Sequence, residues 1–478
     1  MNGRRTRVTR RRLLGVGIGL AALGPLLQAC AGAAPTQAPP KPAGTATPAA
    51  AAQPAAVATK PAPAAKEPAA AGGTAKVTLW HPWSRSIGGP YLDEIVARFN
   101  QQNSGKTQVE PEYITNANSE LDNRIIAAIA ANDPPNIGWS ANPRMAKTGK
   151  ILALDPLVSR DKLELDQFPK GLVENYQYGG KLYGLPIELS VRAIWLNKPL
   201  FEKAKVPYPK EDWTWDDYFR IAKELTERDG DRITVFGSES PFRGSAGSGA
   251  SYYLNWLWPY GGDFFNKDET AVVFNSDAGV AVIDRWVDMA NKSRVTPPKG
   301  TSAGLDAFQA RRCALFETGP WQWGYWIGEL KLPADTQVTP RMKLQQTLQY
   351  SVALWLFNTT EQRNEAAWQF LRYFFSKDVN AEWGYKTGYL PVRKDSQETP
   401  EYKKYLESTA PQMQAMIKQL QWARTRPGER LPNRAKIEKI FGDELMEAMN
   451  ERKTPKQALD DAAKAINGDK SLFEKIEA

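Results

Sequence analysis

The segment from residue 75 to residue 140 alternates between strand-like and helix-like hydrophobic patterns. The strand-like stretches are "AKVTLWH", "QVEPEYI" and "PPNIGWS", and the helix-like stretches between them are "YLDEIVARFNQQ" and "SELDNRIIAAIAAN". Ser119 is a candidate N-cap for the second helix, and Asp122 lies in its first turn. Such an alternation predicts an α/β fold, in which a mostly parallel sheet is covered by helices.

The ends of these strands carry the first candidate binding residues. In parallel sheets, ligands bind beyond the carboxyl ends of the strands. Core packing remains the alternative for the tryptophans, but large aromatic residues at consecutive strand ends favour a ligand role. We therefore expect contacts from Trp80, Trp83, Arg85, Trp139 and Asn142.

The length and charge of the chain limit the number of folded units and the kinds of partner that we expect. A chain of 478 residues is too long for one ordinary core, so two or more folded units are expected. The net charge is +9, but residues 1–73 supply nearly all of it and residues 74–478 carry only +1. That balance argues against nucleic-acid binding. With one histidine and two cysteines, the chain cannot build a disulfide framework or a Cys/His zinc site, and we expect no cofactor or metal.

The N-terminus has the pattern of an export signal. Arginines between residues 4 and 12 precede the apolar run "LLGVGIGLAALGPLLQAC", which glycines and Pro25 make a poor permanent membrane span. "TRRRLL" resembles the twin-arginine export motif, and export by the general pathway is the alternative. "LQAC" resembles a bacterial lipobox, in which Cys30 becomes lipidated. We expect residues 1–29 to be the signal and Cys30 to anchor the protein outside the cytoplasmic membrane.

Residues 31–73 have the composition of a tether. They contain 19 alanines and 9 prolines in 43 positions and no aromatic residue. Such a segment cannot bury enough apolar surface to offset the entropy lost on ordering. We therefore expect residues 30–73 to form a disordered connection between the lipidated cysteine and a folded body.

An unusual aromatic cluster lies in "FETGPWQWGYW", residues 316–326. The Gly319-Pro320 corner favours presentation of Trp321, and an extended chain would place Trp321 and Trp323 on one side. The alternative is a buried core strand. Trp258, next to Pro259, is a further candidate for an aromatic face that contacts a ligand. In contrast, "WQFLRYFF" has helical spacing and predicts core packing.

Motifs for enzymatic chemistry are weak. "GTSAG" matches a nucleophile elbow but has no histidine after it, and "GSAGSGA" lacks the last glycine of a dinucleotide fingerprint. A pair of carboxylates for a glycosidase cannot be excluded among 53 acids. An exported lipoprotein enzyme acting on polysaccharide therefore stays an alternative, although we expect no enzymatic activity.

The stretch "GGKLYGLPIELSVRAIWLNKPLFEKAKVPYPKEDWTWDDYF" resembles the signature of bacterial extracellular solute-binding proteins of the type-1, sugar-binding family, the receptors of ABC importers. The resemblance continues through "YGGDFFNKDETAVVFNS", "FETGPWQWG", "AAWQFLRYFFSKDVNAEWGYKTGYLPVR" and "TPKQALDDAAKAING", and covers residues 74–478. The chain departs from the family at Asn136, where many sugar receptors have aspartate after the proline.

The resemblance implies two α/β lobes with a type II periplasmic-binding-protein fold, joined by several crossing strands. Lobe one would contain residues 74–188 and 350–376, and lobe two residues 190–348 and 378–478. A carbohydrate, a mono- or oligosaccharide, would bind between the lobes, hinge closure would trap it, and a monomeric receptor would deliver it to the permease. A non-sugar solute is the alternative cargo.

The same resemblance adds site residues. The crossing segment "IELSVR" alternates apolar and polar side chains, so its polar face would look into the cleft through Glu188, Ser190 and Arg192. For Arg192, an interlobe salt bridge is the alternative. "TGYLPVR" resembles a cleft-lining loop and adds Tyr389 and Arg393. The number of candidate arginines leaves room for an acidic or substituted sugar.

Overall fold

The computed structural model describes residues 73–115, 120–139, 145–146, 149–242, 246–297 and 303–475. These residues all belong to one unit, Pro68–Ala478. The expected signal, Cys30, most of the tether, Ser119 and Asn142 lie outside the described residues. In the described part, no helix is long and apolar enough to cross a membrane. The same residues contain no group of three or more His, Cys, Asp or Glu side chains that could hold a metal.

The first sheet is built from the predicted β-α-β alternation and two later strands. Its spatial order is β2 (Thr107–Tyr113), β1 (Ala75–His81), β3 (Ile137–Trp139), β14 (Ala353–Leu356) and β6 (Gly184–Pro186). β1 pairs in parallel with β2 and β3, with Leu79 opposite Ile137. β14 runs antiparallel to β3 and β6. The carboxyl ends of β1, β2, β3 and β6 therefore share one edge.

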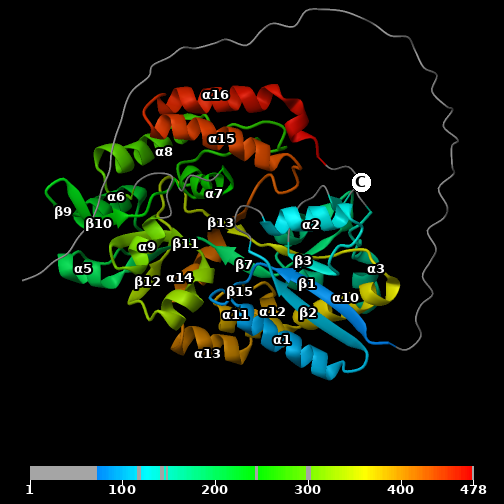
Figure 1. Ribbon diagram of the computed structural model, residues 1–478. Helices are drawn as coiled ribbons and strands as arrows, with labels where there is room; N and C mark the ends of the chain where they lie inside the picture. The colour runs from blue at the N-terminus through cyan, green and yellow to red at the C-terminus, as the bar shows by residue number, and fades with distance from the viewer. Residues whose placement is uncertain are drawn as a thin grey trace, which may run out of the picture. The chain divides into compact units, whose positions relative to one another are not determined.

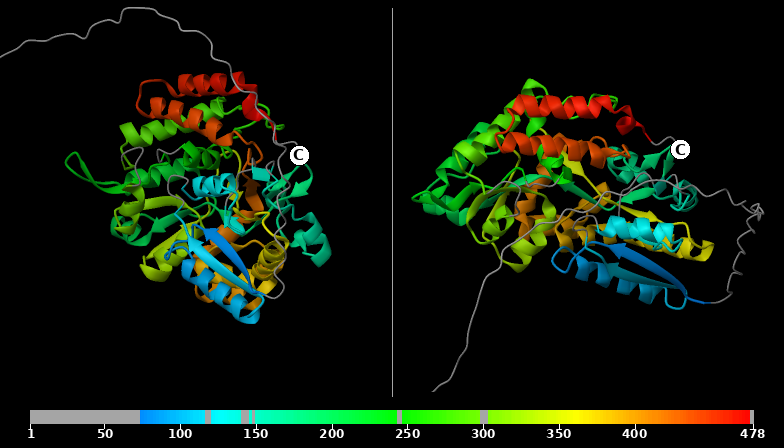
Figure 2. Two further views of the ribbon diagram at one scale, coloured as in Figure 1. Left: turned by 45° about the vertical axis from the view of Figure 1, so that its right-hand side comes forward. Right: turned by 45° about the horizontal axis from the view of Figure 1, so that its top comes forward.

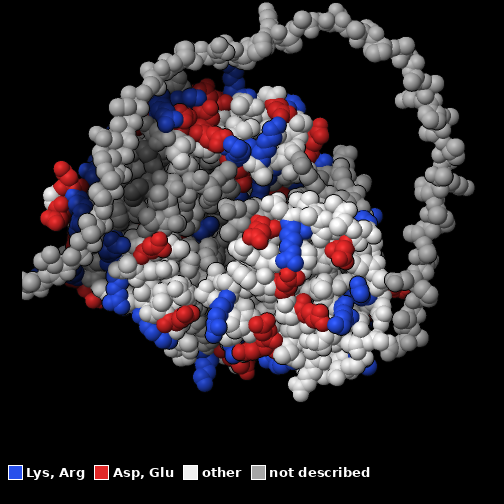
Figure 3. Space-filling model, viewed as in Figure 1, with Lys and Arg blue, Asp and Glu red and all other residues white. Residues whose placement is uncertain are grey.

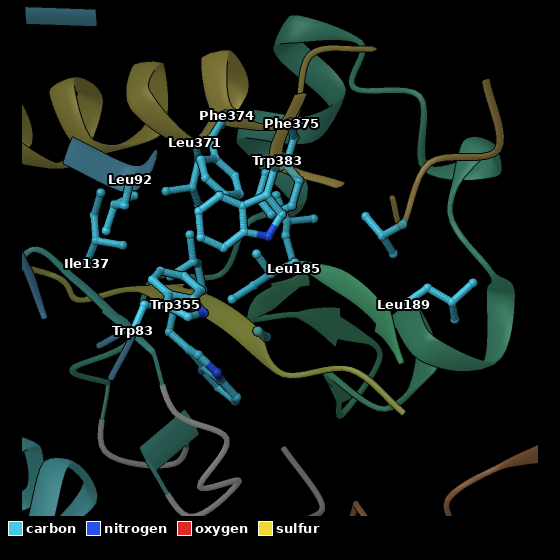
Figure 4. Packing of buried hydrophobic residues seen from close by; sticks show 14 of the residues in the cluster. Trp83, Leu92, Ile137, Leu185, Leu189, Trp355, Leu371, Phe374, Phe375 and Trp383 are labelled. Atoms are coloured by element: carbon cyan, nitrogen blue, oxygen red, sulfur yellow. The ribbon is translucent and has the colours of Figure 1, made fainter. Parts of the chain in front are cut away.

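Helices cover both faces of this sheet. α1 (Gly89–Gln102) and α2 (Glu120–Ala130) lie on opposite sides of it (Figure 1). α10 (Glu361–Phe374), formed by the predicted "WQFLRYFF" core helix, packs on the side of α1, where Phe370 meets Phe99 at 5.2 Å between ring centres. Figure 4 shows the core below α10, in which the Trp83 ring lies 4.9 Å from that of Trp383. The predicted core role of α10 is confirmed.

Shorter elements complete this region. α11 packs against α1 and α13, and Arg98 of α1 binds Glu382 of α11 through two hydrogen bonds of 3.0 and 2.5 Å. The remaining bounds are α3 (Asp155–Asp161), α4 (Lys170–Glu174), β4 (Gln177–Tyr178), β5 (Lys181–Leu182), α11 (Lys377–Thr387), α12 (Lys394–Gln397), α13 (Pro400–Ser408) and α14 (Gln414–Gln419). Residues 378–416, which the sequence assigns to lobe two, thus contribute to the hydrophobic cluster around the first sheet.

The second sheet has the order β12 (Ala334–Gln337), β8 (Ala193–Asn197), β11 (Cys313–Thr318), β10 (Arg232–Ser238) and β9 (Glu227–Asp229). Of its neighbouring pairs, only β10 with β11 is parallel. The prediction of a mostly parallel sheet in each lobe is therefore wrong for this one. β8 runs antiparallel to both β11 and β12, and local β-α-β patterns do not reveal such long-range pairing.

Helices surround the second sheet and carry a second hydrophobic cluster, in which Phe441 contacts Tyr253 at 5.0 Å and Phe264 at 5.2 Å. They are α5 (Lys198–Ala204), α6 (Trp215–Glu224), α7 (Ala246–Leu257), α8 (Asp277–Val287), α9 (Ala303–Gln309), α15 (Arg434–Met449) and α16 (Pro455–Gly468). Both views in Figure 2 place α15 and α16 on the far side of the body from β1 and β2. The first cluster continues through Trp195 and Trp326 onto β8 and the segment after β11, so the core does not separate at the predicted lobe boundaries.

A four-stranded sheet connects the two larger ones, and we call it the crossing sheet. Its order is β15 (Leu390–Pro391), β7 (Glu188–Val191), β13 (Thr347–Tyr350) and β16 (Ala423–Thr425). The chain runs from β6 of the first sheet through β7 into β8 of the second, and returns from β13 into β14. Ser190 lies opposite Tyr350 in the β7–β13 pair. The prediction that the chain crosses more than once is confirmed.

Threonine side chains cap two of the helices around the second sheet. Thr214 accepts a hydrogen bond from the backbone N–H of Asp217, whose carboxylate in turn accepts from the Thr214 backbone N–H, which forms a complete capping box on α6. Thr454 caps α16 through a single hydrogen bond, in which its hydroxyl accepts from the Gln457 N–H.

Replacing Thr214 with alanine should lower the free energy of unfolding by about 1 kcal/mol, because α6 loses its cap. Thr214→Ser should retain most of the stability. Urea denaturation of the full chain measures both. Equal stability of Thr214→Ala and the wild type would show that water replaces the cap without cost.

Candidate ligand-binding site

The crossing segment buries three polar side chains in a row. Glu188, Ser190 and Arg192 alternate with Leu189 and Val191, and their exposed fractions are 3, 1 and 6%. Burying such groups is costly unless partners satisfy them. The predicted polar face of the segment is present, but part of its hydrogen-bonding capacity is unused.

Arg192 is enclosed by aromatic rings. Its Nη1 donates to the Tyr252 hydroxyl at 3.1 Å, and the guanidinium carbon lies 4.5 Å from the ring centre of Tyr252, 5.1 Å from that of Trp321 and 5.6 Å from that of Tyr350. Burial acts to lower the pKa of Arg192, but Tyr252, Tyr350 and Glu317 more than offset this, so the pKa is raised and the group is charged. In the described part of the chain, no carboxylate lies within ion-pair distance of Arg192.

The backbone of Arg192 is held from the other side. Its carbonyl accepts from the Gln419 side-chain amide at 2.7 Å and from the Thr347 hydroxyl at 3.3 Å. Asn255 on α7 accepts from the Leu348 N–H at 2.7 Å. These buried bonds tie β7 and β13 to α7 and α14, so the side chain of Arg192 is presented from a rigid support.

Glu188 and Ser190 carry unused polar atoms. Within the described residues, Glu188 Oε2 and Ser190 Oγ are buried and form no hydrogen bond, although the Val352 N–H donates to the Glu188 carboxyl group. Burial raises the pKa of Glu188 to about 8, so the group is mostly protonated at neutral pH. It can then donate a proton as well as accept one.

Trp321 is half-buried and faces this group. β11 ends at Thr318, and Pro320–Gln322 form a 3-10 turn that folds the indole back over Gly319. A Cβ at Gly319 would lie 1.8 Å from the Trp321 ring, so only glycine permits this position. The ring meets Tyr350 edge-on at 6.0 Å between centres. Gly319 and Pro320 therefore present Trp321 to Arg192, as the sequence predicts for this corner.

Trp323 does not lie on the same side of the chain as Trp321. Residues after Thr318 form helical turns, first Pro320–Gln322 and then Gly324–Glu329, so the period-two alternation of an extended chain does not apply. Trp323 is buried against Tyr405, with 5.3 Å between ring centres. The expectation that the two indoles face one way is wrong, and Trp323 is part of the core.

Three other predicted residues have structural partners. Arg393 is 4% exposed and binds Asp395 and Glu164, each at 2.7 Å. Trp258 is fully buried and donates to Asp263 at 2.9 Å. Trp83 is 3% exposed within the first core. Each lies where packing or ion pairing accounts for it, and the structure does not bring these three to Arg192.

The predicted residues at the strand ends divide by face. Trp80 lies on the α2 face of β1, where Arg124 covers its ring at 4.4 Å. Trp139 is half-buried at the end of β3, and its indole nitrogen has no partner among the described residues. Arg85 is exposed after β1. Tyr389, in contrast, lies close enough to Glu188 and Tyr350 for both to act on its pKa, which burial raises well above its usual value.

Comparison with known proteins identifies the family of the chain. The family described as bacterial extracellular solute-binding protein matches residues 94–410. The chain belongs to this family. The resemblance found in the sequence is thus confirmed at the level of the family.

Relatives of this solute-binding protein have named cargoes. The sn-glycerol-3-phosphate-binding periplasmic protein UgpB of Brucella melitensis is 24% identical over 421 residues, which cover 81% of this chain and 91% of UgpB. The Listeria monocytogenes ABC substrate-binding protein solved with cycloalternan has a TM-score of 0.72, 24% identity, and coverage of 83% of this chain and 98% of that one. The cyclic alpha-maltosyl-1,6-maltose binding protein of Arthrobacter globiformis has a TM-score of 0.70, 23% identity, and coverage of 84 and 100%. These likenesses confirm the α/β binding-protein fold.

Sequence reasoning missed two members of the site of this solute-binding protein. Tyr252 lies on α7 and Tyr350 at the end of β13, and both rings lie against Arg192. Nothing in the local sequence marks either residue. Tyr350 reaches the site because β7 and β13 pair over a separation of 160 residues. Only the register of that pair brings Tyr350 to the polar face.

Glu188 should make the stability of this solute-binding protein depend on pH. Its folded-state pKa of about 8 exceeds the value of about 4.3 in an unfolded chain. The stabilisation from its neutral form is therefore complete below about pH 4.3 and is lost as the pH rises to about 8. Tyr176 and Tyr389 have raised pKa values and stay protonated in this range.

Glu188→Gln should remove this dependence. Its free energy of unfolding relative to the wild type should grow between pH 5 and pH 8.5 by a few kcal/mol, at about 1.4 kcal/mol per pKa unit. Denaturant titrations at several pH values measure the difference. The exposed Glu174→Gln is the control and should show no trend, and a flat difference for Glu188→Gln would contradict the buried, neutral carboxyl.

Proposed function

We propose that this protein is an extracytoplasmic receptor that captures a carbohydrate and delivers it to an ABC transporter permease. The observation that carries the proposal is the group of Trp321, Tyr350 and Arg192 beside the unpartnered polar atoms of Glu188 and Ser190. Aromatic faces suit the C–H faces of a sugar ring, and a guanidinium, a hydroxyl and a protonated carboxyl suit its hydroxyls.

The crossing sheet supports a receptor mechanism. Glu188, Ser190 and Arg192 lie on the strand that connects the two large sheets, so a ligand bound to them contacts residues attached to both. We propose that residues 74–188 and 350–376 form one lobe and residues 190–348 and 378–478 the other, with residues 378–416 packed against the first. Hinge closure around the sugar would then signal occupancy to the permease. The receptor acts as a monomer, without enzymatic turnover.

Two of the related structures support a carbohydrate cargo, since they were solved with or are named for cyclic oligosaccharides. A second candidate is a polyol phosphate, as in the named cargo of UgpB. It is favoured by Arg192, a buried guanidinium with no carboxylate at ion-pair distance in the described part of the chain. A phosphate would match its charge and its planar donors. On the face seen in Figure 3, acidic and basic side chains are interspersed, so charge at the surface does not select the cargo.

The N-terminal sequence supports a location outside the cytoplasmic membrane. Export through a twin-arginine or general signal in residues 1–29, followed by lipidation of Cys30, would place the folded body outside the cytoplasmic membrane. The Ala/Pro-rich residues 31–73 would let an anchored receptor reach its permease.

Trp321→Ala should weaken sugar binding by at least tenfold, because the ligand loses its stacking face. Arg192→Met should weaken it as well, by removing donors to the ligand oxygens. Calorimetric titration of the full chain with a panel of neutral sugars, sugar acids and glycerol phosphate measures the affinities, and a ligand-induced rise in melting temperature checks them.

The matched control is Trp80→Ala, because that indole is also half-buried but lies on the α2 face of β1 under Arg124. It should leave the affinity within twofold. Binding of the panel that is unaffected by Trp321→Ala would refute the site. Binding of glycerol phosphate alone would establish the second candidate and exclude the first.

Cys30→Ser should release the protein from the membrane fraction, because the thiol that takes the lipid is absent. Metabolic labelling with an alkyne-bearing fatty acid should mark the wild type and not the variant. Cys313→Ser, which alters the buried cysteine of β11, is the control and should remain labelled. Equal labelling of wild type and Cys30→Ser would exclude the lipobox.

A further inference from the structure

The polar face of the crossing strand β7 carries two unused oxygen atoms. Glu188 and Ser190 lie on the same face of the strand, and Leu189 between them belongs to the hydrophobic cluster shown in Figure 4. Glu188 Oε2 and Ser190 Oγ are buried and form no hydrogen bond with any described residue, so they do not bond to each other. Two residues along an extended strand span about 7 Å. Both oxygen atoms are therefore placed to bind neighbouring atoms of a single cargo molecule.

Hydroxyl groups and backbone surround the Glu188 carboxyl group. Pro391 of β15 lies opposite Glu188, and the Val352 N–H donates to the carboxyl group from the connection between β13 and β14. Tyr389 and Tyr176 lie near enough for Glu188 to act on their pKa values, which burial raises well above the usual value. Both phenols are therefore uncharged below about pH 10.

The cations near β7 are engaged by other groups. Arg192, on the same strand, is held by Tyr252, and Arg393, which follows β15, pairs with Asp395 and Glu164. The remaining charged side chains of α11 and β16 are exposed or paired, and they are Lys377, Asp378, Glu382, Lys386 and Arg424. In the part of the chain that the structure describes, Glu188 therefore has no cation beside its carboxyl group.

A buried carboxyl group without a cation favours its neutral form, because nothing offsets the lost hydration of the charge. In agreement with this, burial raises the pKa of Glu188 to about 8. Oε2 has no partner, so the Val352 N–H bonds to Oε1 and the proton belongs on Oε2. At neutral pH this O–H, like that of Ser190, has no acceptor among the described residues.

The strand therefore presents hydrogen-bond donors in succession. The O–H groups of Glu188 and Ser190 are followed by the guanidinium of Arg192, which has donors only. Three half-buried aromatic rings border this face, and they are those of Trp321, Tyr350 and Tyr389. Such a face suits cargo oxygen atoms that accept hydrogen bonds and carry no proton.

We propose that Glu188 binds cargo in its protonated form, so that the capture of cargo is linked to a proton. This inference rests on the proposed function and deepens it by naming what the cargo offers to Glu188. The cargo supplies an oxygen atom that accepts a hydrogen bond, as in a sugar acid, a phosphorylated polyol or the ether oxygen of a glycosidic bond. An ionised Glu188 would place two acceptors in contact inside a buried site, which is costly.

This linkage makes the affinity depend on pH in one direction. Cargo that requires the proton raises the pKa of Glu188 above the value of about 8 in the protein without cargo. The affinity is therefore constant well below pH 8. It falls as the pH rises through 8, and the fall approaches about tenfold per pH unit.

Calorimetric titration of the full chain at pH 6.5 and pH 9 tests the linkage. The probes are neutral disaccharides, the sugar acids gluconate and glucuronate, and a phosphodiester of glycerol, none of which changes its ionisation between these pH values. Wild-type affinity for a bound probe should fall about tenfold from pH 6.5 to pH 9. Circular dichroism at both pH values confirms that the protein stays folded.

Two variants of Glu188 separate the proton from the side chain that holds it. Glu188→Gln replaces the O–H donor with an N–H donor that does not titrate, so its affinity should be the same at both pH values. Glu188→Ala lacks the donor and should bind more weakly than Glu188→Gln at both. Glu174→Gln, which alters an exposed carboxyl group, is the matched control and should keep the wild-type pH profile.

A measurement on the wild type alone counts the proton. At pH 8 about half of the Glu188 carboxyl groups are ionised before cargo binds, given the pKa of about 8. Titrations at pH 8 in two buffers of different ionisation enthalpy should therefore show the uptake of about half a proton per cargo molecule. Glu188→Gln should show no uptake.

Several outcomes would overturn the proton linkage and leave the proposed function intact, because cargo still binds in each. They are a wild-type affinity that is constant or rises between pH 6.5 and pH 9, the release of protons on binding, and a fall in affinity that persists in Glu188→Gln. If the wild type binds no probe at either pH, the proposed function is refuted together with this inference. Proton uptake that Glu188→Gln abolishes supports the linkage.

Discussion

The burial of a charged guanidinium at the junction of two sheets is the constraint on which this structure depends. Arg192 is 6% exposed and would be costly to bury without compensation. Three aromatic rings and the Tyr252 hydroxyl supply part of that compensation. These partners come from α7, from β13 and from the turn after β11. The charge therefore constrains how four separate segments are assembled.

The same junction explains why a binding site arises there. The crossing strand must pass between two hydrophobic clusters, yet it carries Glu188 and Ser190 with polar atoms that no described residue satisfies. Apolar residues of similar size would pack there at lower cost. Retaining polar groups in such a place is understandable if a ligand completes their hydrogen bonds. The buried polar groups lower the folding stability, and a ligand that bonds to them gains affinity. Both effects arise where the two sheets meet.

Much of the fold could be predicted because its signals are local. The β-α-β alternation, the core face of α10 and the polar face of the crossing segment all follow from hydrophobic periodicity. The prediction that Trp321 is presented from the chain rested on the Gly-Pro corner. The close approach of its ring to Gly319 explains why glycine is required there. Trp323 was misjudged because the chain there turns helically after Thr318.

The sequence by itself determined the α/β class, the family, the order of strands and helices along the chain and the alternation that buries Arg192. These depend on neighbours within a few residues or on ordered motifs. The tertiary structure alone decided which aromatic residues surround Arg192, which arginines are paired, and that Tyr113 faces His81. Those outcomes depend on strand register and on contacts between residues as far apart as Ser190 and Tyr350. Pairing at such separations is set by the packing of the whole core, and no local pattern encodes it.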